Sequence, residues 1–332
     1  MTTIIPYTYE RKREKTIQFT SLVENMKVLV ATEKPFAAEA VNGIKEICEA
    51  AGYQVVLLEK YTDKAQLLEA VADVDALIVR SDKVTAEVIA AARNLKIVVR
   101  AGAGYDNVDL AAATARGVVV MNTPGQNSNA VAELALAMMI YMSRNRFTPG
   151  TGCEIQGKTL GIHAYGNVGK LVGRKGKAMG MNVIAYDPFI TDDAVFENDG
   201  VGKVGSVEEL YAQSDFLSLH IPATPATRGS IGYDLLTSMP KGGTLVNTAR
   251  KEVIDEEGLE KALDERADLK YITDIAPEAA EHLAEKFGKR FFATPKKMGA
   301  ETAEANINAG LAAARQIVDY FVNGTTRFQV NK

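Results

Sequence analysis

The chain has 332 residues, of which 47% are apolar and 24% charged, and its formal net charge is −4. This length favours two domains over one, and a weakly acidic chain gives no reason to expect nucleic acid or an anionic membrane as a partner. The longest apolar run, 134–142, is too short to span a bilayer and predicts a buried helix.

Residues 1–25 are predicted to form an N-terminal extension. They carry a run of charges from Glu10 to Lys15 and lack the apolar stretch of a secretory signal. The two cysteines, Cys48 and Cys153, are far apart in sequence and are expected to be small buried groups rather than a disulfide framework. This pattern fits a reducing compartment, the cytoplasm.

From Met26 onward, short apolar runs alternate with helical patterns. Strands are predicted at 28–31, 55–58, 76–79, 97–99 and 118–121, with helices at 37–51, 64–71 and 85–92 between them. Strands without polar alternation are buried on both faces, as in a parallel sheet covered by helices. The pattern therefore predicts a doubly wound α/β fold. Further helices are expected at 130–142 and 303–321.

The segment 159–188 has the order strand, glycine turn, helix, strand. Gly166 would let the backbone approach a pyrophosphate, and Gly169 would let the new helix pack on the strand, with its N-terminal amides facing the phosphates. Asp187 follows Gly169 by 18 residues, where a carboxylate accepts hydrogen bonds from a ribose diol. No arginine follows closely to receive a 2′-phosphate, so the pattern favours NAD over NADP.

The first glycine of the G-x-G-x-x-G fingerprint is replaced by Ala164. Alanine tolerates this position only if its φ is negative, so a negative φ is predicted there.

Charged residues follow three later strand-like runs. Arg250 follows 245–247, Asp274 follows 271–272, and Lys296 and Lys297 follow 291–293. Each could be a solvated loop charge, but ligands of parallel sheets bind at the carboxyl ends of strands. A guanidinium also matches the two oxygens of a carboxylate. Together the charged residues after these three strands indicate a substrate site beside the nucleotide.

Several longer segments resemble one enzyme family. They are VRSDKVTAEVI (79–89), RAGAGYDNVD (100–109), VVVMNTPGQNS (118–128), SLHIPATPATRGSI (218–231), LVNTARKEVIDEEGL (245–259) and ITDIAPE (272–278). With the fingerprint they resemble the D-2-hydroxyacid dehydrogenases, and VRS plus RAGAGYDNVD resembles the phosphoglycerate-oxidising members. The resemblance implies a discontinuous flavodoxin-like substrate-binding domain (26–122 and 303–332), a Rossmann NAD-binding domain (123–302), a cleft between the two doubly wound sheets, and a homodimer through the helix at 130–142.

The resemblance also implies which residues bind ligands; no metal is expected. Cofactor contacts are expected from Ala164, Gly166, Asn167, Val168, Gly169, Asp187, Pro188, His220, Ile221, Pro222, Thr227, Thr248, Ala249, Arg250, Asp274 and Gly299. Substrate contacts are expected from Arg80, Ser81, Arg100, Ala103, Gly104, Asn127, Arg250 and Lys297, with Arg80 and Ser81 facing a phosphate.

The sequence departs from the family at its catalytic histidine. Where the family has P-H-x-G, this chain has Pro295-Lys296-Lys297-Met298-Gly299. Counting forward from the proline selects Lys296, and counting back from Gly299 selects Lys297, which we favour. The glutamate that accompanies the histidine is replaced by Ala279, with Glu278 one residue early as a further catalytic candidate. Loss of that carboxylate suits a lysine base, because a neighbouring carboxylate would hold the proton on the amine.

Three histidines remain. His163 is expected to be structural, His220 to pack beside the cofactor groove, and His282 to lie in a charged helix. The resemblance therefore implies NAD-dependent oxidation of 3-phospho-D-glycerate to 3-phosphohydroxypyruvate, with Lys297 taking the hydroxyl proton and Arg250 polarising the new carbonyl. Two alternatives remain open: a glyoxylate or hydroxypyruvate reductase, and an NAD-sensing protein without turnover.

Overall fold

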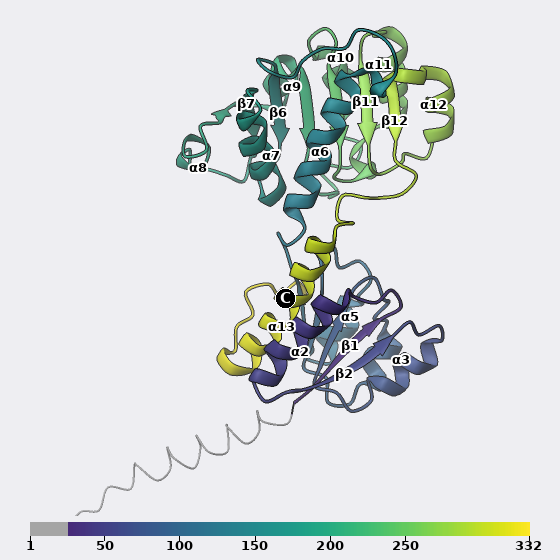
Figure 1. Ribbon diagram of the computed structural model, residues 1–332, viewed down its shortest axis with the longest axis vertical. Helices are drawn as coiled ribbons and strands as arrows, with labels where there is room; N and C mark the ends of the chain where they lie inside the picture. The colour runs from purple at the N-terminus through teal and green to yellow at the C-terminus, as the bar shows by residue number, and fades with distance from the viewer. Residues whose placement is uncertain (1–25) are drawn as a thin grey trace, which may run out of the picture. The chain divides into compact units, whose positions relative to one another are not determined.

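The computed structural model describes residues 26–332, so the predicted extension 1–25 lies outside the described residues. The chain divides into two compact units (Figure 1). The first comprises the described residues up to Asn127 together with Thr302–Lys332, and the second is Ser128–Glu301. The chain therefore leaves the first unit once and returns to it for its last helix.

The first unit contains a five-stranded parallel sheet in the order β2-β1-β3-β4-β5. The strands are β1 (Lys27–Thr32), β2 (Gln54–Glu59), β3 (Ala76–Val79), β4 (Ile97–Arg100) and β5 (Val119–Asn122). This is the flavodoxin-like strand order. The helices are α2 (Ala38–Ala50), α3 (Lys64–Ala70), α4 (Ala86–Ala91), α5 (Leu110–Ala115) and α13 (Ala303–Asn323).

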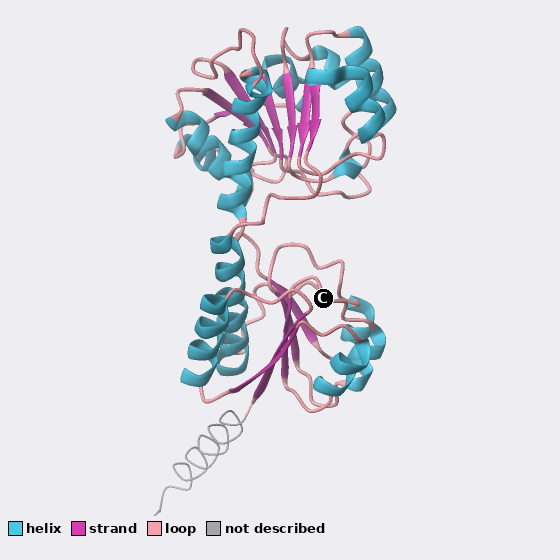
Figure 2. Ribbon diagram, turned by 45° about the vertical axis from the view of Figure 1, so that its right-hand side comes forward, coloured by secondary structure: helices cyan, strands magenta, loops and turns pink. Residues whose placement is uncertain are grey.

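Both faces of this sheet are buried, which explains its apolar strands. Val28 and Val30 pack with α2 and α13 on one face, whereas Leu29 and Ala31 pack with α3, α4 and α5 on the other. Figure 2 shows the two helix layers on either side of the strands. Alternate residues of one strand thus enter two separate cores, as the pleat requires.

The second unit contains a seven-stranded parallel sheet in the order β12-β11-β10-β9-β6-β7-β8. The strands are β6 (Thr159–His163), β7 (Asn182–Tyr186), β8 (Gly202–Lys203), β9 (Phe216–Leu219), β10 (Thr244–Asn247), β11 (Lys270–Thr273) and β12 (Phe291–Ala293). From β6 the chain first adds β7 and β8 outward, and then crosses back to add β9 on the other side. This is the Rossmann order with one additional strand, and its topological switch lies between β6 and β9.

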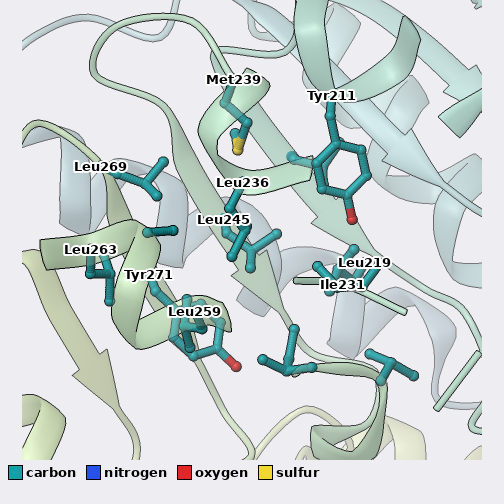
Figure 3. Packing of buried hydrophobic residues seen from close by; sticks show 14 of the residues in the cluster. Tyr211, Leu219, Ile231, Leu236, Met239, Leu245, Leu259, Leu263, Leu269 and Tyr271 are labelled. Carbon is teal, nitrogen blue, oxygen red and sulfur yellow. The ribbon is translucent and has the colours of Figure 1, made fainter. Parts of the chain in front are cut away.

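Helices cover both faces of this second sheet. They are α6 (Ser128–Ser143), α7 (Asn167–Ala178), α8 (Ala194–Glu197), α9 (Val207–Gln213), α10 (Tyr233–Ser238), α11 (Glu256–Glu265) and α12 (Ala280–Phe287), with 3-10 turns at Asn145–Phe147, Lys251–Val253 and Gly288–Arg290. One core lies among α9, α10 and α11, where Leu236, Leu245 and Leu259 pack together (Figure 3). A second core lies under α6 and α7. The predicted doubly wound parallel α/β fold is confirmed in both units.

One prediction about burial is wrong. Cys48 is buried, and burial raises the pKa of its thiol to about 12, but Cys153 is exposed. Cys153 lies in the loop between α6 and β6, where no apolar layer covers it. Among the described residues, no helix is long and apolar enough to cross a bilayer.

Candidate active site

The carboxyl ends of the strands of the second unit form one edge of its sheet. Going across this edge, Asp187 follows β7, the glycine turn follows β6, Ile221 follows β9, Thr248 follows β10 and Asp274 follows β11. Because all strands are parallel, residues from distant parts of the sequence meet at this edge. The structure therefore brings the predicted nucleotide-binding residues of this unit to the same end of the sheet.

The glycine turn corrects the expectation for its first position. Ala164 has a φ of 77°, in the left-handed region, and not the negative value that was predicted. The turn requires this conformation because the Ala164 carbonyl oxygen packs against the first turn of α7. A Cβ on Gly169 would lie 2.3 Å from that oxygen. An alanine in this conformation costs about 1–2 kcal/mol relative to the right-handed one.

The other two positions of the turn differ in the space around them. Gly169 has no room for a side chain, since its Cβ would also lie 3.0 Å from Ile162 Cγ2. Gly166 has an ordinary φ of −80°, and beyond its neighbours in the chain no described residue comes within 4 Å of the place where its Cβ would be. The open side of Gly166 is where a pyrophosphate can approach the backbone.

Helix α7 begins directly after this open position. Its N-cap, Gly166, provides no side-chain hydrogen bond to the first turn, which contains Asn167 and Val168. The first amides of a helix have no intrahelical partner, and they carry the positive end of the helix dipole. The start of α7 therefore suits a phosphate.

Asp187 is held rigidly at the end of β7. Its Oδ2 accepts a hydrogen bond from the amide of Tyr165 (2.9 Å), and its Oδ1 accepts one from the amide of Phe189 (3.0 Å). Each carboxylate oxygen has two lone pairs, so capacity remains for two ribose hydroxyls. Pro188 is exposed beside it.

Two buried oxygens at the other end of this edge make no hydrogen bond within the described part of the chain. They are Thr248 Oγ1 and Asp274 Oδ1. An unsatisfied buried polar atom costs about 1–3 kcal/mol, and a ligand group that pairs with it would remove that cost. The amide of a nicotinamide ring offers both a donor and an acceptor for such atoms. The turn, Asp187 and these two oxygens therefore fit NAD.

Arg250 projects from a turn that a buried asparagine organises. The side chain of Asn247, at the end of β10, donates to the Arg250 carbonyl oxygen (2.9 Å) and accepts from the Ala249 amide (2.9 Å). The guanidinium of Arg250 is partly buried and donates to the Ala249 carbonyl oxygen (2.8 Å). The sequence reasoning missed Asn247; the signal was an asparagine ending an otherwise apolar strand.

Other predicted residues of this unit have their own local partners. Thr227 Oγ1 donates to the Pro222 carbonyl oxygen (2.5 Å) and closes the loop after β9. Lys296 and Lys297 are exposed in the segment that follows β12. Glu278, the further catalytic candidate, is also exposed, and its carboxylate pairs with Lys251 Nζ (3.3 Å).

Each of the three histidines has a polar partner of its own. Burial lowers the pKa of His163 to about 4, and its Nδ1 lies 3.5 Å from the Tyr211 hydroxyl. Burial also lowers the pKa of His220 to about 3; its Nε2 lies 3.0 Å from Ser218 Oγ. His282 is exposed on α12, where it pairs with Glu260. The first two are therefore neutral at neutral pH.

In the first unit, two arginines meet at the ends of neighbouring strands. Arg80 follows β3 and Arg100 ends β4, and Arg100 Nε donates to the Arg80 carbonyl oxygen (2.9 Å). The guanidinium of Arg100 lies against Gly102, where any Cβ would meet it at 1.5 Å. Burial, and then the charge of Arg80, lower the pKa of Arg100. Within residues 26–332, neither arginine forms an ion pair with a carboxylate, so this end of the sheet suits an anion.

Of the remaining substrate-side candidates in the first unit, Ser81, Ala103 and Gly104 lie near these arginines in the sequence, and Asn127 follows β5. Ser81 and Ala103 are exposed, and Gly104 and Asn127 are partly buried. The carbonyl oxygen of Ala103 accepts from Asn122 Nδ2 (2.6 Å), which ties its loop to the end of β5.

Two residues that position Arg80 were missed from the sequence. The buried carboxylate of Asp82 accepts from the Arg80 amide (3.2 Å) and from the Tyr61 hydroxyl (2.9 Å). Asn306, in the first turn of α13, accepts from the Arg80 guanidinium. Asp82 lies in a polar run after β3, between Ser81 and Lys83, and Asn306 is distant in sequence, so neither residue carried a signal.

Comparisons with known proteins agree with this geometry. A family model described as "D-isomer specific 2-hydroxyacid dehydrogenase, NAD binding domain" matches residues 135–296. The chain is similar to the crystal structure of cofactor (NAD+)-bound 3-phosphoglycerate dehydrogenase of Entamoeba histolytica, with a TM-score of 0.82 and 52% identity over 93% of this chain and 99% of that one.

Two curated proteins are also similar. D-3-phosphoglycerate dehydrogenase of Methanocaldococcus jannaschii is 38% identical over 312 residues, which are 88% of this chain and 57% of that protein. Hydroxypyruvate reductase of Thermotoga maritima is 35% identical over 285 residues, which are 80% of this chain and 90% of that protein. The chain thus spans little more than half the length of the first relative. It belongs to the D-2-hydroxyacid dehydrogenase family, with NAD as its cofactor.

Proposed function

We propose that the protein oxidises 3-phospho-D-glycerate to 3-phosphohydroxypyruvate with NAD. The observation that carries this proposal is the pair of neighbouring arginines, Arg80 and Arg100, neither of which forms a salt bridge within the described residues. A phosphate ester carries about −1.5 to −2 charges at neutral pH, which two guanidiniums balance. Glyoxylate has no second anionic group for them. The similarity to the two phosphoglycerate dehydrogenases supports the same substrate.

Each group in the reaction has a proposed residue. Arg250 binds the substrate carboxylate and polarises the carbonyl that forms at C2, while Asp274 and Thr248 orient the nicotinamide. Lys297 takes the proton of the C2 hydroxyl, with Lys296 as the alternative. NAD, when bound, accepts the hydride from C2. The C2–H and O–H bonds break, and the electron pair of the O–H bond becomes the second bond of the C2 carbonyl.

The phosphate assignment is tested by substrate discrimination. NADH consumption at 340 nm is measured with phosphohydroxypyruvate and with glyoxylate. Arg80→Ala is expected to raise the KM for phosphohydroxypyruvate by about 10–100-fold, because a charge-assisted contact contributes about 1.5–3 kcal/mol, and to change the KM for glyoxylate little. Arg93→Ala, which removes an exposed arginine of the same unit, is the control. Equal changes for both substrates would contradict the assignment.

The lysine assignment is tested by single and double substitutions. Lys297→Ala is expected to lower kcat by about 10²–10⁴-fold, the usual contribution of a general acid or base, with a smaller effect for Lys296→Ala. If the double variant oxidises phosphoglycerate as fast as the unaltered enzyme, neither lysine is the base.

Two other functions have support. A hydroxypyruvate or glyoxylate reductase is favoured by the T. maritima relative, most of whose length the chain covers. It predicts a higher kcat/KM for hydroxypyruvate than for its phosphorylated form. An NAD-sensing protein without turnover is favoured by the lysines at the position of the family's histidine. It predicts no NADH consumption even at high enzyme concentration.

We also propose a cytoplasmic homodimer. Helix α6 supports the dimer, since Leu134, Ile140 and Tyr141 remain only partly buried on it. The free Cys48 and Cys153 support a reducing compartment. Light scattering after size exclusion, with Ile140→Lys as the disrupting variant, tests the dimer.

A further inference from the structure

The segment 294–299, which carries both candidate lysines, is hydrogen-bonded to a single residue, Asp274, at the end of the neighbouring strand β11. Asp274 Oδ2 accepts hydrogen bonds from the amides of Gly299 (2.7 Å) and Met298 (3.2 Å). The Asp274 carbonyl oxygen also accepts from Thr294 Oγ1 (3.1 Å). The two ends of the segment therefore bond to the same residue.

Close packing makes this attachment specific. A Cβ on Gly299 would lie 3.0 Å from Asp274 Oδ2 and 3.2 Å from Val131 Cγ2 on α6. A side chain at position 299 would force Asp274 or Val131 to shift by a few tenths of an ångström, so glycine suits this close approach. Between its ends, the segment is exposed from Pro295 to Met298. Asp274 therefore accepts three of the hydrogen bonds that hold this segment.

The anchoring carboxylate is itself incompletely satisfied. Asp274 is fully buried, yet its Oδ1 makes no hydrogen bond within the described residues. One oxygen therefore holds the segment, while the other is the atom that fits the nicotinamide amide. A donor on Oδ1 would compensate its desolvation and hold the carboxylate in the rotamer that binds Met298 and Gly299.

We propose that Asp274 is a positioning residue that couples nicotinamide binding to the placement of the lysine segment 294–299. The coupling deepens the proposed function, because that function assigns proton transfer to this segment. Cofactor binding would favour the conformation in which segment 294–299 is hydrogen-bonded to Asp274 over its other conformations. The difference is a coupling free energy between the cofactor site and the segment. The lysine would then be in position only when a hydride acceptor is present.

Hydrogen exchange of the full-length protein tests the coupling without turnover. A peptide spanning 295–300 reports the Met298 and Gly299 amides. Saturating NAD is expected to slow their exchange by about tenfold or more, since local opening becomes less favourable. ADP-ribose contains the adenosine and both phosphates but lacks the nicotinamide, and is expected to leave this peptide unchanged. Equal slowing by ADP-ribose would overturn the proposal, and this comparison needs no variant.

Substitutions identify the residue responsible. In Asp274→Ala, exchange of the peptide is expected to be fast and insensitive to NAD. Asp187→Asn is the matched control: it should weaken both ligands, yet saturating NAD should still protect the peptide. Protection by NAD that persists in Asp274→Ala would overturn the proposal.

The same data separate this inference from the proposed function. Protection by NAD requires no substrate, so it is expected even if phosphoglycerate is not oxidised. Loss of phosphoglycerate turnover with NAD protection intact would refute the proposed substrate and leave the coupling standing. Turnover without NAD-dependent protection would refute only the coupling.

Discussion

The two glycines of the nucleotide turn should respond oppositely to the same added methyl group. In Gly169→Ala the new Cβ would lie 2.3 Å from the backbone oxygen of Ala164 and 3.0 Å from Ile162 Cγ2. Neither the strand nor the helix can move away cheaply, and overpacking of this kind costs about 1–3 kcal/mol. For a unit of this size that lowers Tm by about 2–12 °C.

Gly166→Ala adds its methyl group to open space at a φ of −80°. A compatible Gly→Ala change stabilises by about 0.4–1 kcal/mol, chiefly through the unfolded chain. The methyl group would, however, occupy the place where a pyrophosphate approaches, so NADH affinity should fall by about tenfold or more. Gly166→Ala is therefore expected to fold normally and bind NADH weakly.

Thermal unfolding and a titration followed by NADH fluorescence distinguish these outcomes. Gly242→Ala, at a φ of 84° in an exposed turn, is a control for strain without ligand contact. The reasoning would be refuted if Gly166→Ala lowered Tm as much as Gly169→Ala, or if Gly166→Ala bound NADH normally.

Three further predictions concern protons and the C-terminal tail. Phosphoglycerate oxidation should rise with pH more steeply than the reverse reduction, because Lys297 must lose its proton to act as a base and keep it to act as an acid; parallel pH profiles in the two directions would exclude it. The pKa of His163 falls from 6.5 to about 4 on folding, so the unfolded chain binds a proton there first as pH falls. The free energy of unfolding should therefore decrease between pH 6.5 and 4, by on the order of 2 kcal/mol for this group, and urea unfolding of His163→Leu should show a shallower pH dependence. Asn331→Ala removes buried hydrogen bonds to the Val120 amide (2.8 Å) and the Val118 carbonyl oxygen (2.8 Å) at the edge of β5, so it should cost about 1–3 kcal/mol in urea unfolding, whereas the exposed Asn323→Ala should change little.

The sequence by itself determined the parts of this protein that depend on local pattern. Apolar runs without polar alternation identified the parallel strands, because a strand buried on both faces must be apolar on both. The fingerprint predicted the unit of strand, turn, helix and strand that ends at Asp187, since close packing and phosphate contact require those residue types at that spacing. The resemblance of longer segments predicted membership of the D-2-hydroxyacid dehydrogenase family, and the comparisons with known proteins confirmed that prediction.

Tertiary structure alone decided how distant residues combine. The positive φ of Ala164 follows from the close packing of its carbonyl oxygen against Gly169. The conformational preference of alanine alone favours a negative φ. Parallel strands bring separate segments of the chain to the same edge of their sheet. For this reason Arg80 contacts Arg100 in the first unit, and segment 294–299 is hydrogen-bonded to Asp274 in the second. Such contacts depend on strand order in the sheet, which no local stretch of sequence encodes.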